Sequence, residues 1–280
     1  MQRIIASIVI FSFLFPQYVY ANNKGPSIKE ALEITVNQQV LSQKISKIYL
    51  TLCYDVRNPT LYQERTAAIE QFEDNLYQLS LFVPNERVKE HIQGVRAIWK
   101  TFKAVADWSI KKEAVKTLLS KADELLKASK MLHSAYQEYE YTVKDNNNWI
   151  TINQYINHIQ HQKVLVQRIL TYYMANEQTG ELLDYSIELE AAKKSFVRIL
   201  VILENAATTS ESIQENLKLI RIQWHSILKQ FEAKEVMIDV LYQLLANGVA
   251  IEENIQKVMD SYAILSGNLS LSYTIDQGAR

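Results

Sequence analysis

The chain has few of the residues that interrupt helices, with 6 glycines and 4 prolines among 280 residues. In average proteins these two residue types make up about 12% of positions. Their scarcity argues against turn-rich sandwiches and barrels and against nucleotide-binding folds that depend on glycine-rich loops. No proline follows Pro84, and a proline inside a helix costs about 3 kcal/mol. The composition therefore predicts an all-α protein with long, uninterrupted helices.

Cysteine and net charge are also scarce. Cys53 is the only cysteine, which excludes an internal disulfide framework, a cysteine-rich zinc site and haem attachment through C-x-x-C-H. The 30 lysines and arginines nearly balance the 31 aspartates and glutamates, so no overall field attracts nucleic acid or acidic lipid. The sequence has no G-x-S-x-G, glycine-rich phosphate loop or H-E-x-x-H; these are common signatures of enzymes. We expect a protein that is not an enzyme, has no cofactor and binds no nucleic acid.

The first 21 residues have the pattern of a secretory signal peptide. Arg3 is followed by an apolar run over residues 4–15, and Val19, Tyr20 and Ala21 form a candidate cleavage site. This run is too short to cross a bilayer core of about 30 Å. We expect export to the periplasm, with secretion as an alternative, and no stable membrane insertion after cleavage. An uncleaved anchor is the competing interpretation.

An internal repeat divides the rest of the chain. Residues 38–49 align without gaps with residues 162–173, at an offset of 124. The later matches keep this offset or one of 125, and they pair Ala68, Phe72, Leu76, Leu79, Arg96 and Trp99 with Ala192, Phe196, Leu200, Leu203, Arg221 and Trp224. Three matches in the same order indicate a duplicated domain. We predict one copy over residues 22–145, a second over 146–265, and a loose tail over 266–280.

Each copy divides into four helical segments. The predicted helices span residues 27–55, 59–82, 85–107 and 111–144 in the first copy, and 149–176, 180–206, 210–232 and 234–265 in the second. Asn58 and Ser210 are the expected N-caps of two of these helices, and the polar segment 145–148 joins the copies. Short connections favour antiparallel neighbours. The predicted architecture is therefore two tandem antiparallel four-helix bundles.

The first helix of each copy has two faces. One face carries an apolar stripe that should point into the core: Gln38, Leu41, Ile45, Ile48 and Leu52 in the first copy, and Gln162, Leu165, Ile169 and Tyr172 in the second. The nearly opposite face mixes polar and apolar residues: Val36, Gln39, Gln43, Ser46 and Leu50, and Lys163, Gln167, Leu170 and Met174. A mixed outer face of this kind suggests that each first helix packs against a helix outside its own bundle.

These two segments resemble a known sensory family. The pattern I-N-x-A-G-x-Q-R-M-L-S-Q-R-M-x-K-x-Y is found in the amino-terminal periplasmic domain of type IV pili methyl-accepting chemotaxis transducers and, in divergent form, in nitrate/nitrite sensors of the PilJ/NarX kind. The matching residues are Gln38, Leu41, Ser42, Gln43, Lys47 and Tyr49 in the first copy, and Ile156, Asn157, Gln162, Leu165, Gln167, Arg168 and Tyr173 in the second.

The resemblance implies a four-helix bundle that senses small ligands. We expect this chain to be a non-catalytic protein of that kind that acts with a membrane-bound transducer or another envelope protein. In the nitrate sensors of this family, the arginine of the Q-R-M step binds the anion between two subunits. Gln39 and Lys163 occupy the corresponding positions here, so neither copy supplies that arginine.

The duplication suggests that one chain contains both halves of such an interface. If the two first helices pair, they would form an asymmetric pocket for a small anion or another small polar ligand. The pocket would be built from Gln39, Gln43, Lys163 and Gln167, with Lys44 and Arg168 beside it. The alternative is that these stripes only pack or face solvent. The protein would then be a structural or adaptor bundle that binds another envelope protein and no small ligand.

Histidines and tryptophans give weaker signals. His158 and His161 are close enough on a helix to share a metal, but no nearby Glu-x-x-His or cysteine completes a site. We therefore predict polar surface histidines and no metal, and His133 is isolated in the sequence. Trp99 and Trp224, each three residues after an arginine, are predicted to lie in the core.

Overall fold

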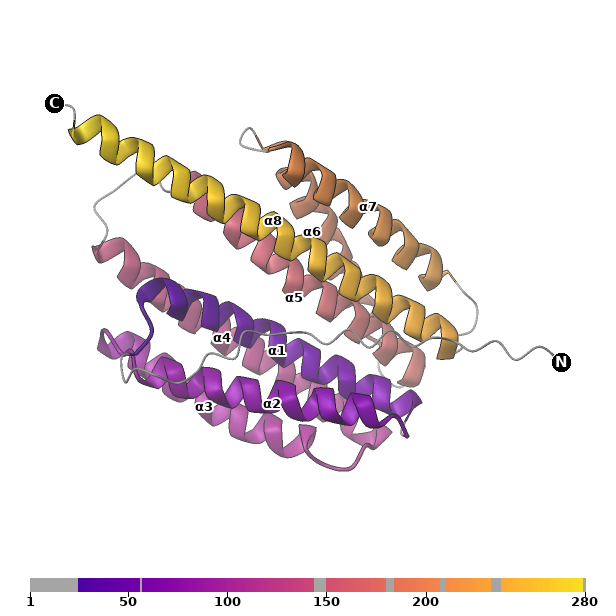
Figure 1. The fold of residues 1–280 in the computed structure, drawn as a ribbon. Coiled ribbons are helices and arrows are strands. Elements are labelled where there is room, and N and C mark those ends of the chain that lie inside the picture. Colours follow the sequence, from indigo (N-terminus) through magenta and orange to yellow (C-terminus); the bar gives the residue numbers. More distant parts are fainter. Residues whose placement is uncertain are drawn as a thin grey trace.

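The computed structural model describes residues 25–55, 57–143, 150–179, 184–206, 210–232 and 238–278. In this part of the chain it is helical and contains no strand, which confirms the all-α prediction (Figure 1). The α-helices are α1 (Ile28–Tyr54), α2 (Pro59–Ser80), α3 (Glu86–Ala106), α4 (Val115–Val143), α5 (Ile150–Thr179), α6 (Ser186–Glu204), α7 (Glu211–Phe231) and α8 (Ile238–Gly278). The expected signal peptide and the joint at residues 145–148 lie outside the described residues.

Side-chain caps define several helix starts. The Asn58 Oδ1 atom accepts from the amides of Thr60 and Leu61 at the start of α2, at 3.1 and 3.3 Å. The Ser210 hydroxyl accepts from the Ile213 amide at 3.3 Å at the start of α7. Both predicted caps are therefore confirmed, and each satisfies first-turn donors that have no partner within the helix.

Several helix limits differ from the prediction; helix α6, for example, begins at Ser186 where residue 180 was predicted. A short 3-10 turn, η1 (Lys112–Ala114), precedes α4. The helix α8 continues to Gly278, where a loose tail was expected from residue 266. That expectation was based on the weak apolar periodicity of the segment. Such periodicity indicates whether one face of a helix packs against the protein, and a helix can continue without it. No proline interrupts this segment.

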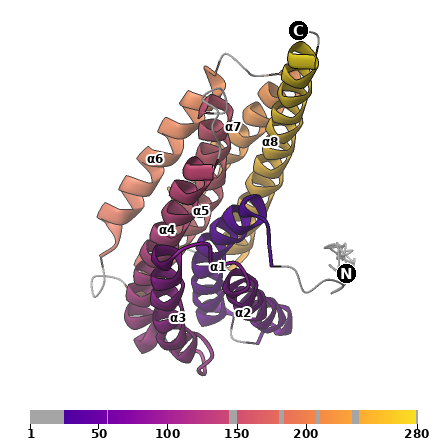
Figure 2. The same ribbon diagram turned by 90° about the vertical axis from the view of Figure 1, so that its left-hand side faces the viewer.

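Most helix contacts lie within one half of the chain, and the most extensive contact between the two halves is that of α1 with α5. Helix α1 packs on α2 and α4, and α3 packs on α4; likewise α5 packs on α6 and α8, and α7 packs on α8. In both views α1 to α4 occupy the lower part of the molecule and α5 to α8 the upper part (Figures 1 and 2). Helix α1 also packs extensively on α5. None of the described helices is long and apolar enough to cross a membrane.

Equivalent aromatic pairs lie in the core of each half. The rings of Phe72 and Trp99 stack with centroids 4.0 Å apart, and those of Phe196 and Trp224 lie 4.6 Å apart. Both indoles are buried, as the sequence predicted. The sequence repeat matches these four residues in two pairs, so the matched positions make the same contact in space.

Two glycines inside helices provide a matched test of packing. Replacing Gly94 in α3 with alanine is expected to stabilise the protein by about 1 kcal/mol, because alanine is the better helix former and its Cβ would meet no atom within 4 Å. At Gly248 in α8 the same Cβ would lie 2.6 Å from Cδ1 of the buried Leu170 of α5. We expect Gly248→Ala to gain less or to destabilise. Urea unfolding of both variants measures the difference, and equal stabilisation would contradict a tight α5–α8 contact.

Candidate functional site

The contact between α1 and α5 is unusually polar for buried helix faces. Half of the buried side chains of α1 are polar: Thr35, Gln38, Gln39, Ser42, Gln43, Ser46, Lys47 and Thr51. Helix α5 adds Gln160, Gln162, Gln167 and Thr171. Buried polar groups are costly unless they are hydrogen-bonded. The hydroxyls of Ser42, Ser46 and Thr51 donate to carbonyls one turn earlier in the same helix, at 2.8, 3.1 and 2.9 Å.

The two first helices run parallel, with equivalent residues side by side. Towards the carboxyl ends, the Thr51 hydroxyl lies 3.6 Å from the Met174 sulfur, and the Tyr54 hydroxyl donates to the Met174 carbonyl at 3.3 Å. Towards the amino ends, Gln39 and Gln160 line one recess. In each of these pairs, the two residues are separated in the sequence by nearly the repeat offset of 124, so the residues that meet are close to equivalent in the two copies. The mixed outer face of α1 therefore packs against a helix of the other half, as predicted.

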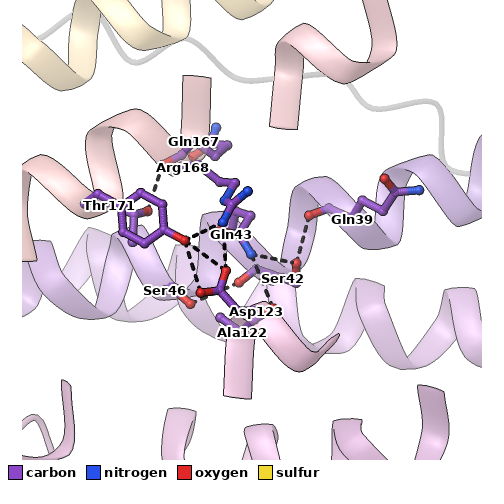
Figure 3. Close-up of polar contacts among 10 residues, drawn as sticks. Gln39, Ser42, Gln43, Ser46, Ala122, Asp123, Gln167, Arg168 and Thr171 are labelled. Atoms are coloured by element: carbon purple, nitrogen blue, oxygen red, sulfur yellow. Dashed lines mark hydrogen bonds and ion pairs between the residues drawn. The ribbon is translucent and has the colours of Figure 1, made fainter. Parts of the chain in front are cut away.

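One flank of this helix pair faces α4. The Gln43 amide donates to the Ala122 carbonyl at 3.4 Å. The Arg168 guanidinium, from α5, pairs with the Asp123 carboxylate at 3.1 Å, and the Tyr172 hydroxyl donates to the same carboxylate at 2.9 Å (Figure 3). The Arg168–Asp123 pair thus connects the second half of the chain to a helix of the first half.

The other flank faces α8 and gathers lysines around one carboxylate. The Gln167 amide donates to Glu252, and the Lys163 ammonium donates to Gln256. Burial raises the pKa of Glu252, while the charges of Lys47, Lys44 and Lys163 lower it. Conversely, burial lowers the pKa of the Lys47 ammonium, and the Glu252 charge raises it. Burial of this carboxylate and of Lys47 is therefore partly offset by their mutual attraction.

In each half of the chain, a basic residue of the first helix interacts with an acidic residue of the other half. Lys44 and Arg168 occupy equivalent positions of the repeat. The Lys44 charge, on α1, acts on Glu252 of α8, and Arg168 of α5 pairs with Asp123 of α4. Each first helix therefore directs its basic residue to the last helix of the other half.

A recess of about 200 Å³ opens where α1, α4 and α5 meet. Its walls are formed by Val36, Gln39, His133, Gln137, Asn157, Gln160 and His161. Gln39 and Gln160 are only 6% and 8% exposed, and within the described residues neither amide side chain makes a hydrogen bond. Buried amides require hydrogen-bond partners, so this recess suits a small polar ligand or water.

Both histidines of the recess are neutral at neutral pH. Burial is the main cause that lowers the pKa of His133 to about 4 and that of His161 to about 4. The Nδ1 atom of His133 lies 2.8 Å from the Thr35 hydroxyl oxygen, and that hydroxyl donates to the Leu32 carbonyl. The Thr35 hydroxyl has a single proton, so the donor and acceptor roles within its pair with Nδ1 depend on the tautomer of the ring. His161 was expected on the surface and instead forms part of the recess wall.

The six residues proposed from the sequence do not share one pocket. All lie at or beside the α1–α5 contact, but they divide into three groups. Gln39 lines the recess, Gln43 and Arg168 bond to α4, and Lys163, Gln167 and Lys44 face Glu252 or its neighbour on α8. A ligand-binding role for these residues stays a prediction.

Sequence reasoning missed the partners that come from distant helices, including Asp123, Glu252 and His133. One local signal was available for the recess, because Gln160 stands where the sensory motif has glycine. A long amide replacing a small residue on a helix face that packs indicates a change in what that face contacts. No comparable feature of the sequence pointed to Asp123 and His133 of α4 or to Glu252 of α8.

Comparison with known proteins adds no assignment: no family model, no curated protein and no solved structure matches the chain. The described residues contain no cluster of three or more histidine, cysteine, aspartate or glutamate side chains arranged to hold a metal. The interpretation of the site therefore depends on its own geometry and charges.

The lysine–carboxylate cluster can be tested with a double-mutant cycle. Lys47→Met and Glu252→Gln should each destabilise the protein, by about 1 to 3 kcal/mol, because each removes one member of a coupled group of charges. The double variant should lose less than the sum of the two, since neither charge then remains. Urea unfolding gives these free energies. Lys218→Met, on an exposed position of α7, is the control and should change stability by less than about 0.5 kcal/mol. Strict additivity would contradict the coupling.

The recess histidines predict a loss of stability in acid. Between pH 6.5 and about 4 the unfolded chain binds more protons than the folded one, because the folded pKa values are depressed. Stability should therefore fall as the pH drops through this window, by up to about 1.4 kcal/mol per pH unit for each histidine. Glu252, with its raised pKa, acts in the opposite direction.

The comparison of variants isolates the histidine contribution. Urea unfolding of the wild type and of His161→Gln at pH 7.0, 5.5 and 4.5 should show a shallower acid slope in the variant. His225→Gln, at an exposed site on α7, should keep the wild-type slope. Equal slopes for wild type and His161→Gln would show that His161 titrates normally in the folded protein.

Proposed function

We propose that the chain is an exported, non-catalytic sensory or ligand-binding protein built of two tandem antiparallel four-helix bundles. Helix contacts within α1 to α4 and within α5 to α8 support this arrangement. The equivalent core pairs Phe72–Trp99 and Phe196–Trp224 support the duplication. The expected signal peptide supports a periplasmic location.

The parallel pairing of α1 and α5 is the observation that carries the proposal. In the family that the sequence resembles, a ligand lies between the first helices of two subunits. Here the two first helices belong to one chain, they lie side by side, and two buried amides at their contact, Gln39 and Gln160, have no side-chain partner within the described residues. A small polar ligand held at this contact would complete the hydrogen bonds that the protein leaves open.

A ligand at this position would also bear on the relation between the two bundles. It would touch α1 and α5 together, so its binding energy would favour one arrangement of the pair over another. We propose that a membrane-bound transducer or another envelope protein reads that arrangement.

A second candidate function is an adaptor bundle that binds an envelope protein and no small ligand. Helices α6 and α7 favour it with six exposed aliphatic side chains: Ile187, Val197, Val201, Ile202, Leu219 and Ile222. The equivalent positions of α2 and α3 hold Gln63, Glu73, Tyr77, Gln78, Gly94 and Ala97. The second copy is therefore more apolar than the first on these helices, although both copies have the same internal contacts.

Thermal unfolding of the chain lacking residues 1–21 tests the ligand-binding proposal against nitrate, nitrite and a set of amino acids at fixed ionic strength. A ligand that binds only the native state, at 100 times its dissociation constant, should stabilise it by about 2.7 kcal/mol. Gln39→Leu should abolish a shift that arises in the recess, and Lys163→Ala one that arises on the α8 flank. Lys218→Ala, on an exposed position of α7, should leave the shift unchanged.

The result separates the two candidate functions. A saturable shift that either site variant removes supports a ligand at the α1–α5 contact. The absence of a shift with every compound contradicts the ligand-binding proposal as tested and favours the adaptor. A shift that persists in both variants would place the ligand elsewhere in the protein.

A further inference from the structure

Helices α2 and α6 occupy equivalent places in the two halves, but their outer faces carry opposite charges. Each packs on the first helix of its own half, and in both views α2 lies in the lower part of the molecule and α6 in the upper part (Figures 1 and 2). At the repeat offset of 124, Lys194 and Arg198 of α6 correspond to Glu70 and Asp74 of α2. All four residues are exposed. Cations on one outer face therefore stand where the other has carboxylates.

Other charges on these helices pair within the chain. On α2, which has four carboxylates and a single cation, Arg65, the Glu73 carboxylate pairs with the Lys103 ammonium of α3 at 2.7 Å. On α6, the Lys193 ammonium pairs with the Glu190 carboxylate at 2.5 Å. These ion pairs do not include the two cations of α6 or the two carboxylates of α2 described above. A second protein molecule could therefore meet those four charges without breaking either ion pair.

The shapes of the two faces also differ in a complementary way. Exposed Val197 and Val201 lie beside the cations of α6, and α7 adds exposed Leu219 and Ile222. At the offset of 125, the equivalents of the last two on α3 are Gly94 and Ala97, both exposed. A Cβ added at residue 94 would meet no atom within 4 Å. Bulky side chains on α7 thus correspond to small residues on α3.

Each face fits the other better than it fits itself. Two α6 faces in contact would bring cations together, and two α2 faces would bring carboxylates together, which is unfavourable in either case. The two cations are four residues apart on α6, and so are the two carboxylates on α2. Four residues rise about 6 Å along a helix. Both cations can therefore meet both carboxylates whether α2 and α6 run parallel or antiparallel.

We propose that copies of this chain associate head-to-tail, with α6 and α7 of one copy packed on α2 and α3 of the next. Lys194 and Arg198 of one copy pair with Glu70 and Asp74 of the next, and the aliphatic side chains of α6 and α7 lie between the helices. Each copy has one face of each kind, so the contact is heterologous and repeats, as a ring or a filament. This inference does not depend on the binding of a small ligand.

The size of the faces predicts a weak contact. Two neighbouring helices of about 20 residues form a surface of about 30 by 20 Å, or about 1,200 Å² buried over both partners. This area lies at the lower end of specific interfaces, at about 1,200 Å². The exposed ion pairs then matter for association, and salt should weaken it.

Sedimentation velocity of the protein over a range of concentrations tests the inference. The average mass should rise with concentration at about 0.05 M salt, and the rise should be much smaller at about 0.5 M, where exposed charges are screened. Reversing the charges of α6, with Lys194→Glu and Arg198→Glu together, should weaken association at least about tenfold. Reversing those of α2, with Glu70→Lys and Asp74→Lys together, should have the same effect.

A mixture of the two double variants tests which faces meet. The α6 variant keeps the carboxylates of α2, and the α2 variant keeps the cations of α6. The equimolar mixture should therefore associate although neither variant does so alone, and this recovery would also show that both variants are folded. Lys116→Glu with Lys127→Glu, at exposed positions of α4, changes the net charge as much as the α6 variant does. This control should associate like the wild type.

Three results would overturn the inference. One is a wild type that stays monomeric at every concentration and at low salt. Another is association that the α2 variant retains alone while the α6 variant loses it, which would indicate an α6–α6 contact. The third is a mixture that fails to associate. None of these results bears on the ligand-binding proposal, which the thermal unfolding measurements test separately.

Discussion

The burial of two half-polar helix faces against each other is the constraint on which this structure depends. Helices α1 and α5 meet through Gln39, Gln43, Ser46 and Gln167, and burying such polar groups is costly unless they are hydrogen-bonded. Three solutions are used along the contact. Hydroxyls bond back to their own helix, amides bond to α4 or α8, and charges pair across the two halves. The recess lies where these solutions leave two amides without partners.

Duplication within one chain explains why the two flanks of the contact differ. In a symmetric dimer both flanks would carry the same residues, because an isologous interface repeats itself. Here the equivalent positions have diverged, so that Ser46 of α1 corresponds to Leu170 of α5 and Lys47 to Thr171. The α8 flank is filled by a carboxylate among lysines, while the α4 flank ends in an open recess. One interface therefore contains a lysine–carboxylate cluster on its α8 side, and the Arg168–Asp123 pair together with the recess on its α4 side.

The charge cluster and the recess have different physical consequences. Lys47 and Glu252 are coupled through burial, and such a pair resists replacement of either partner more than it adds net stability. This property suits a group that maintains the register of α1 against α8. The recess contains histidines with depressed pKa values and amides without protein partners, and both can interact with a ligand or a proton. We interpret the first as a fixed structural element and the second as the responsive one.

The sequence alone determined the helices, their faces and the repeat. The periods of apolar residues placed Ile45 and Ile169 in the core, and the aligned Phe and Trp positions proved to be contacts. These features depend on local geometry, because a helix presents the same face whatever it packs against.

Only the tertiary structure decided which residues meet at the contact. The partners Asp123, His133 and Glu252 lie on α4 and α8, far in sequence from the helices they touch. Their positions depend on the rotation and translation of whole helices, which the spacing of residues within one helix does not specify. The proposed residues were therefore placed at the correct contact but divided among three environments.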